Sequence, residues 1–257
     1  MEKEILLTEG AISVPCIITE PDYGEARRVV LGVHGIAGNS EEDIQRAIAE
    51  EMSMFGSVCI RVDLPGHGKS PMSSKISLKD CMDALMIVAN YARETYPHLE
   101  DLCIFATGFG AYVTLVTLYD LLELPGHIKL VVQTPSVMMH DTLLAMKKIS
   151  RVTLEAMEET TIGRVRPLTL TYGFYQELLE HIAMAAYPIP ILILHGEDDA
   201  YIRMSDIQNF HRLNERSKLV IVPGTTHQFL EEGAWDMVLD LTRDWFEFEQ
   251  VLLSDWE

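Results

Sequence analysis

Two short segments in the carboxyl-terminal third of the chain contain residues that can act as an acid and a base. The first is His195-Gly196-Glu197-Asp198-Asp199, and the second is Gly224-Thr225-Thr226-His227. A carboxylate that accepts a hydrogen bond from one imidazole nitrogen leaves the other nitrogen free to take up a proton. We therefore expect Asp199 to orient His227 as a general base, with Asp198 as the competing carboxylate.

A third segment, Ala106-Thr107-Gly108-Phe109-Gly110, lies where a strand passes directly into a helix. The small residues Ala106 and Gly110 permit a sharp turn, and a nucleophile at the centre of such a turn is exposed. The central residue here is Gly108, which has no side chain that could attack a substrate. The side chain of Thr107 leaves the turn one position early, and we expect it to point into the core beside the sheet.

Two loops that contain glycine follow earlier strand-like runs. His34-Gly35-Ile36-Ala37-Gly38 lets the backbone approach a substrate, and the N–H group of Ile36 could donate to a developing oxyanion. The second loop, Asp63-Leu64-Pro65-Gly66-His67-Gly68-Lys69-Ser70, has two glycines and a proline for tight turns. We expect Asp63 to fix this loop and to take no part in catalysis.

From about Val29 to the last helix, these motifs resemble the α/β-hydrolase family, and within it the cap-bearing serine esterases of the feruloyl and cinnamoyl type. The resemblance implies an α/β-hydrolase fold in which Gly108 occupies the position of the nucleophilic serine. It also implies that Asp199 and His227 are the acid and base, and that the N–H groups of Ile36 and Phe109 form the oxyanion hole. Only the attacking oxygen departs from the pattern.

The elements that must position these residues alternate along the chain. Apolar runs of strand length alternate with longer helical patterns, which is typical of a parallel sheet covered by helices on both faces. The first two runs have no helix between them and should form an antiparallel hairpin at one edge. We expect an α/β fold with an eight-stranded, mostly parallel sheet, whose strands lie near residues 5–8, 14–19, 29–33, 57–62, 102–106, 129–133, 191–194 and 219–222.

Start and stop signals mark the helices between these strands. Ser40 with Asp43, and Ser77 with Asp80, each place a capping side chain three residues before an acidic one. Gly56 should end the first of these helices. Further helices are expected at 111–122, 205–213 and 235–252.

One connection is far longer than the others. About 50 residues separate the run that ends near Thr134 from the run that begins near Pro190, whereas a crossover helix needs roughly 12. We expect residues 138–187 to form a small helical cap inserted after the sixth strand. Residues 1–137 and 188–257 should then form the hydrolase core.

The expected cap is rich in methionine and aromatic residues, which serve either as ordinary core or as the walls of a pocket. It follows the carboxyl end of a strand, where open α/β sheets bind ligands. In the pocket interpretation, Met138, Tyr172 and Tyr175 bind the substrate together with His34 and Gly35. The resemblance implies that this substrate or ligand is a small molecule with a hydrophobic or aromatic acyl group.

The composition restricts the partners and the compartment. A formal net charge of -19 and a pI near 4.8 disfavour nucleic acid and anionic membrane surfaces. The first residues lack the basic region of a signal peptide, and no long apolar run is present, so we expect a cytoplasmic protein. We expect no cofactor and no metal, and the oligomeric state is left open. Four scattered cysteines should be buried free thiols: Cys16, Cys59, Cys81 and Cys103.

Three functions remain open. If Gly108 is an introduced change, the parent is a serine hydrolase. If it is native, the protein is either a ligand-binding relative without turnover, or an enzyme in which His227 and Asp199 activate a water, as in a general-base hydrolase or a lyase. In a subtilisin-type triad, loss of the serine costs on the order of 10⁶ in turnover, while about 10³ to 10⁴ over water remains. We therefore expect weak or no esterase activity by the serine route.

Overall fold

An eight-stranded sheet forms the centre of the protein, and every strand that the sequence predicts for it is present. The structure, a computed structural model, describes residues 2–22 and 26–254, with side chains described as far as residue 248. Residues 1, 23–25 and 255–257 of the predicted core lie outside the described residues. The strands of this sheet are β1 (Glu2–Glu9), β2 (Ile12–Thr19), β3 (Arg28–Val33), β4 (Val58–Val62), β5 (Asp101–Thr107), β6 (His127–Gln133), β9 (Ile191–Gly196) and β10 (Lys218–Val222).

The sheet has the order β1-β2-β4-β3-β5-β6-β9-β10. β1 and β2 form the predicted antiparallel hairpin at one edge, and β2 pairs antiparallel with β4. The other neighbouring strands are parallel, which confirms the predicted fold class. Because parallel strands end at the same edge of a sheet, the loops after β3, β4, β5, β6, β9 and β10 gather there.

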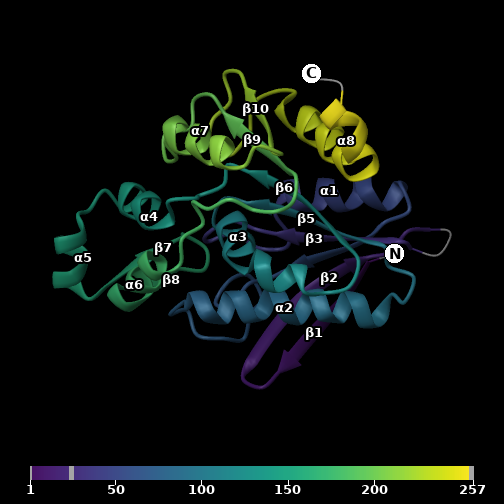
Figure 1. Cartoon of the computed structure of the whole chain (residues 1–257). Coiled ribbons are helices and arrows are strands. Elements are labelled where there is room, and N and C mark those ends of the chain that lie inside the picture. The colour runs from purple at the N-terminus through teal and green to yellow at the C-terminus, as the bar shows by residue number, and fades with distance from the viewer. Residues whose placement is uncertain (1, 23–25, 255–257) are drawn as a thin grey trace.

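Helices cover both faces of this sheet (Figure 1). They are α1 (Asp43–Met54), α2 (Leu78–Thr95), α3 (Gly108–Leu122), α7 (Met204–Leu213) and α8 (Ala234–Ser254). α1 and α8 cover one face, where Met52 and Trp245 share a core with Phe105. α2, α3 and α7 cover the other face, where Leu85 shares a core with Ile104. Successive β5 residues thus face opposite cores, as the two-residue period of a strand requires.

The two predicted helix starts have different outcomes. The Ser77 side chain accepts a hydrogen bond from the Asp80 N–H at 3.3 Å, which confirms the cap of α2. α1 begins at Asp43 and has no side-chain cap, so the prediction that Ser40 caps it is wrong. The N–H of Ser40 instead donates to Oδ1 of Asp63 at 2.7 Å, and this contact holds Ser40 in the loop before the helix.

The long connection between β6 and β9 contains more than the helices that the sequence predicts. Its elements are α4 (Met139–Lys147), α5 (Arg151–Met157), β7 (Glu159–Ile162), β8 (Leu168–Thr171) and α6 (Tyr172–Glu180). They group together at one side of the molecule, on the left of Figure 1. β7 and β8 form a separate antiparallel pair, which the sequence analysis did not anticipate because each strand has only four residues.

This insertion is tied to the loop that follows β4. The guanidinium of Arg166 donates to the backbone oxygens of Gly68 and Ser70. The Thr169 N–H donates to the backbone oxygen of Ser74 at 2.7 Å. The insertion is therefore anchored at the edge of the sheet where the strands end.

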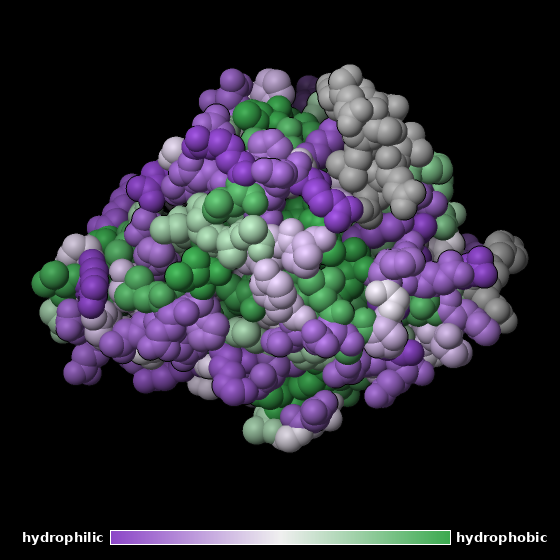
Figure 2. Space-filling view, in the orientation of Figure 1, coloured by the Kyte–Doolittle hydropathy of each residue, from purple (hydrophilic) through white to green (hydrophobic). Residues whose placement is uncertain are grey.

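The surface and the cysteines agree with the composition. Figure 2 shows polar side chains over most of one face, with apolar side chains gathered near its centre. All four cysteines are buried and unpaired, as predicted, and burial raises the pKa of the Cys59 thiol to about 12.

None of the described helices is both long enough and apolar enough to cross a membrane.

Candidate active site

The turn between β5 and α3 has the geometry of a nucleophile elbow. Gly108 is the first residue of α3 and has a φ of +49°, in the left-handed region that L side chains rarely adopt. A Cβ on Gly110 would lie 2.4 Å from the backbone oxygen of His34 and 2.5 Å from that of Val33, so only glycine fits there. The sharp turn expected from the small flanking residues is therefore present.

The elbow has room for a side chain even though Gly108 has none. A Cβ built on Gly108 would meet only the Cα of Gly35 at 3.8 Å and the Oγ of Ser136 at 4.0 Å. Both distances are ordinary van der Waals contacts. Neighbouring atoms therefore leave room for a side chain at this position.

The predicted base and its carboxylate are hydrogen bonded. Nδ1 of His227 lies 2.7 Å from Oδ2 of Asp199, and the other carboxylate oxygen accepts the N–H groups of Tyr201 and Ile202 at 2.8 and 3.0 Å. The Asp199 side chain is fully buried, whereas the His227 side chain keeps 22% exposure. Because a carboxylate can only accept, Nδ1 donates and Nε2 carries the free lone pair. Asp199, and not Asp198, makes this contact.

The electrostatics of the pair favour an ionised carboxylate. Burial raises the pKa of Asp199, but the hydrogen bond and charge of His227 and the two backbone N–H donors outweigh it, so the net shift is downward. The ring of Tyr201 lies edge-on to the imidazole of His227, with centroids 5.3 Å apart. The imidazole is thus fixed in orientation, and an ionised partner stabilises the charge that it gains on protonation.

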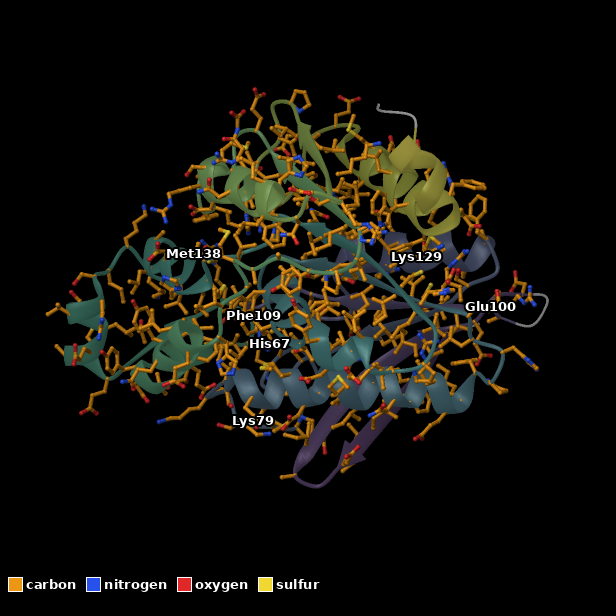
Figure 3. The ribbon with its side chains drawn as sticks, in the orientation of Figure 1. His67, Lys79, Glu100, Phe109, Lys129 and Met138 are labelled. Carbon is orange, nitrogen blue, oxygen red and sulfur yellow. The ribbon has the colours of Figure 1, made fainter. Side chains whose placement is uncertain are left out.

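Two backbone N–H groups are available to hold an oxyanion. The Phe109 N–H belongs to the first turn of α3, which has no internal acceptor, and Thr107 does not cap it with its side chain. The Ile36 N–H makes no hydrogen bond to any group in the described part of the chain. The Phe109 ring points away into the core, where it stacks on His67 with centroids 6.2 Å apart (Figure 3). Only the backbone of Phe109 therefore serves the site.

Ile36, Gly108, Phe109 and His227 line one cavity of about 350 Å³. Its walls come from the loops at the strand ends, from the starts of α1, α3 and α8 and, in one case, from the insertion. They are Gly35, Ile36, Glu42, Asp43, Ile44, Thr107, Gly108, Phe109, Thr134, Ser136, Met146, Tyr201, His227, Gln228, Leu230 and Trp235. A larger cavity of about 580 Å³ at the opposite ends of β5 and β6 has none of these groups in its walls.

Four of the residues predicted to bind substrate do not line this cavity, although Gly35 does. His34 is fully buried: its Nε2 accepts the Leu64 N–H at 3.1 Å, and its Nδ1 lies 2.7 Å from the Gly35 oxygen. These contacts use both ring nitrogens to join two loops, which corrects the predicted role of His34.

The predicted pocket residues of the insertion also lie elsewhere. Met138 packs against the core on the side of α2 and α3, outside the cavity walls. Tyr172 and Tyr175 stack on each other with centroids 6.0 Å apart, and the Tyr172 hydroxyl accepts a hydrogen bond from Arg151 at 3.1 Å. For these three residues the core interpretation of the insertion is the better one. The cavity wall receives Met146 instead.

Polar residues of the cavity that the sequence did not reveal include Thr107, Ser136 and Glu42. Thr107 lines it, although we expected this side chain in the core, because the last residue of β5 already lies at the open edge of the sheet. Ser136 lies three residues after β6, and its position beyond a strand end was an available signal. Glu42 precedes α1 and carried no signal. Its burial, together with the charges of Asp43 and Asp63, raises its pKa to about 7.

Comparisons with solved structures identify the architecture. Est1E from Butyrivibrio proteoclasticus, solved with ferulic acid bound, has a TM-score of 0.80 at 20% identity, over 96% of this chain and 99% of that chain. Mouse alpha/beta hydrolase domain-containing protein 10 has a TM-score of 0.76 at 14% identity, over 95% and 98%. An alpha-beta serine hydrolase homologue from Coxiella burnetii has a TM-score of 0.66 at 16% identity, over 93% and 95%.

The chain therefore has the α/β-hydrolase fold, and its structural neighbours include serine hydrolases. At identities of 20% or less, this likeness shows the fold alone. No protein-family model matches the sequence, and no curated protein is similar enough in sequence to match.

Proposed function

We propose that this protein hydrolyses small carboxylic esters by direct attack of water, without an acyl-enzyme. The observation that carries the proposal is the His227–Asp199 hydrogen bond, in which His227 lines the same cavity as the open side of Gly108. A base that has lost its usual serine partner can activate a solvent molecule in the same place. A protein that only binds a ligand has no need of an oriented base with a free lone pair.

The reaction runs in two steps. Nε2 of His227 takes a proton from water while the water oxygen forms a bond to the ester carbonyl carbon. The carbonyl π electrons move onto the oxygen, which is held by the N–H groups of Ile36 and Phe109. When the tetrahedral intermediate collapses, the alkoxide leaves and takes the proton from His227. Asp199 remains ionised throughout.

The cavity walls support an uncharged substrate with an apolar or aromatic acyl group. Apolar side chains face it, including Ile44, Leu230 and Trp235, while Glu42 and Asp43 disfavour an anionic ligand. The ferulic acid bound to Est1E is an aromatic acid, in agreement with this substrate class.

The proposal extends to the insertion. We assign residues 138–187 as a cap over this site, because the segment is anchored to the loop after β4 and supplies Met146 to the cavity wall. In this role it limits the size of the acyl group and restricts the entry of solvent.

The experiment is a hydrolysis assay of purified protein on a panel of alkyl and aryl esters. We expect a rate about 10⁵ times that of the uncatalysed reaction, and a fall of about 10²-fold in His227→Ala to the remainder that binding and the oxyanion donors supply. A fluorophosphonate probe should leave the protein unlabelled, because it requires an activated hydroxyl. If no ester is hydrolysed but aromatic acids or esters bind, the protein is a ligand-binding relative and the proposal is wrong.

A further inference from the structure

We infer that Ser136 is a positioning residue whose hydroxyl holds the attacking water opposite His227. This inference rests on the proposed function, since it assigns the second contact of the same water. It concerns a residue on the loop after β6, whereas the elbow and the base follow β5 and β10.

The position of Ser136 is fixed by the elbow itself. Its N–H donates to the backbone oxygen of Gly108 at 3.2 Å, so a hydrogen bond joins the two loops. Its Oγ lies 4.0 Å from the point where a Cβ on Gly108 would be, and the residue is only 3% exposed. The hydroxyl is therefore held at the wall of the space that the missing side chain leaves free.

The Ser136 hydroxyl is free to serve a ligand of that space. The one hydrogen bond that Ser136 donates in the described ranges comes from its backbone N–H, and the residue lines the cavity. A localised water needs two to four polar partners. The other near wall of the space is the Cα of Gly35, which cannot bind water, so the Ser136 hydroxyl is the nearest polar group. The His227 imidazole lines the same cavity and can supply the second contact.

The water donates one hydrogen bond to each of these two partners. One hydrogen points to Nε2 of His227 and is transferred when the oxygen attacks. The other points to Oγ of Ser136 and stays on the oxygen. A lone pair is thereby directed into the cavity, where the carbonyl carbon is held by the N–H groups of Ile36 and Phe109.

A role for Ser136 as the nucleophile itself is less well supported. The one side-chain hydrogen bond of His227 in the described part of the chain goes to Asp199, and none joins it to Ser136. An unactivated serine hydroxyl is a weak nucleophile. Only a nucleophilic Ser136 would form a covalent acyl adduct, and mass spectrometry would detect that adduct.

The test compares the 257-residue protein with its Ser136→Ala variant on an aryl ester, in water and in dilute methanol. We expect kcat to fall about 10- to 100-fold with KM changed less than about 2-fold, since only the attacking oxygen loses its orientation. The ratio of methyl ester to free acid among the products should also change. A merely structural role would not alter that ratio.

The Gly108→Ser variant provides a matched control for the role of Ser136. In Gly108→Ser protein the oxygen that attacks in acylation is held covalently, so adding Ser136→Ala should reduce the rate of acylation, measured as the burst of phenol, much less than it reduces kcat in the original chain. An equal loss in both backgrounds would overturn the inference, and so would an unchanged rate and product ratio in Ser136→Ala. An acyl or fluorophosphonate adduct on Ser136 would make it the nucleophile instead. If the original chain hydrolyses no ester, the proposed function fails first and the inference falls with it.

Discussion

Oδ2 of Asp199 accepts a 2.7 Å hydrogen bond from Nδ1 of His227, while its Oδ1 is held by two backbone N–H groups. An amide in place of this carboxylate can present its NH₂ group to Nδ1 and so stabilise the wrong tautomer. We expect Asp199→Asn to lower kcat by at least about 10²-fold. Asp198→Asn is the matched control, because the neighbouring carboxylate does not contact His227. Equal effects of the two changes on ester hydrolysis would contradict the assignment.

The room beside Gly108 predicts a gain of activity. Gly108→Ser should create fluorophosphonate labelling and raise turnover of short aryl esters by about 10³-fold, because base and oxyanion donors already surround the position. Gly108→Ala carries the same Cβ without the oxygen and should gain neither property. Gly108→Ser combined with His227→Ala should lose both gains. Folded Gly108→Ser protein that stays unlabelled and inactive would show that the elbow does not face His227.

The same substitution should lower stability. A non-glycine residue at a φ of +49° costs about 1–2 kcal/mol in the left-handed region. Gly108→Ser and Gly108→Ala should therefore both lower the free energy of unfolding by a similar amount in urea titrations. Unchanged stability in both variants would mean that the turn relaxes away from this conformation.

The raised pKa of Glu42 should make the stability of the fold depend on pH. Its pKa is about 7, against an ordinary value of 4.5, because burial and the charges of Asp43 and Asp63 disfavour its charged form. Between these two values the folded chain binds more protons than the unfolded chain, so stability falls as pH rises from about 4.5 to 7. Relative to the original protein, Glu42→Gln should gain about 1–3 kcal/mol between pH 4.5 and 8. Parallel urea titrations of the two proteins across this range would contradict the assignment if their difference stayed constant.

The buried imidazole of His34 should lower the stability of the fold at acidic pH. Burial lowers its pKa from 6.5 to about 4, despite the opposing hydrogen bond with Gly35. The unfolded chain therefore binds the proton first, and stability is lost as pH falls from about 6.5 towards 4. His34→Gln, whose amide can still accept the Leu64 N–H, should flatten this part of the pH profile of unfolding. A profile unchanged by the substitution would assign the acid sensitivity to another group.

The sequence predicts the sheet and the His227–Asp199 contact well, for a physical reason. Apolar runs of strand length that alternate with helices bury their side chains by forming a parallel sheet. The residues that follow such strands then meet at one edge of that sheet. The position of Gly108 in a sharp turn also follows from its small neighbours. These properties depend on local sequence and chain direction, which the sequence contains.

The errors concern the directions of side chains, which depend on tertiary packing. His34 follows a strand like the true site residues, yet it points inward and joins two loops. Tyr172 and Tyr175 stack on each other within the insertion, and no local pattern distinguishes such a pair from a pocket wall. Ser136 and Glu42 reach the cavity because loops from different strands converge there.

The central claim is that the attacking oxygen belongs to water and not to the protein. Intact-mass spectrometry during steady-state turnover of an aryl ester tests it most directly, with release of the phenol followed in the same sample. The account predicts phenol release that requires His227, with the protein mass unchanged at every time point. A mass increase equal to the acyl group, or phenol release at an unchanged rate in His227→Ala, would contradict it.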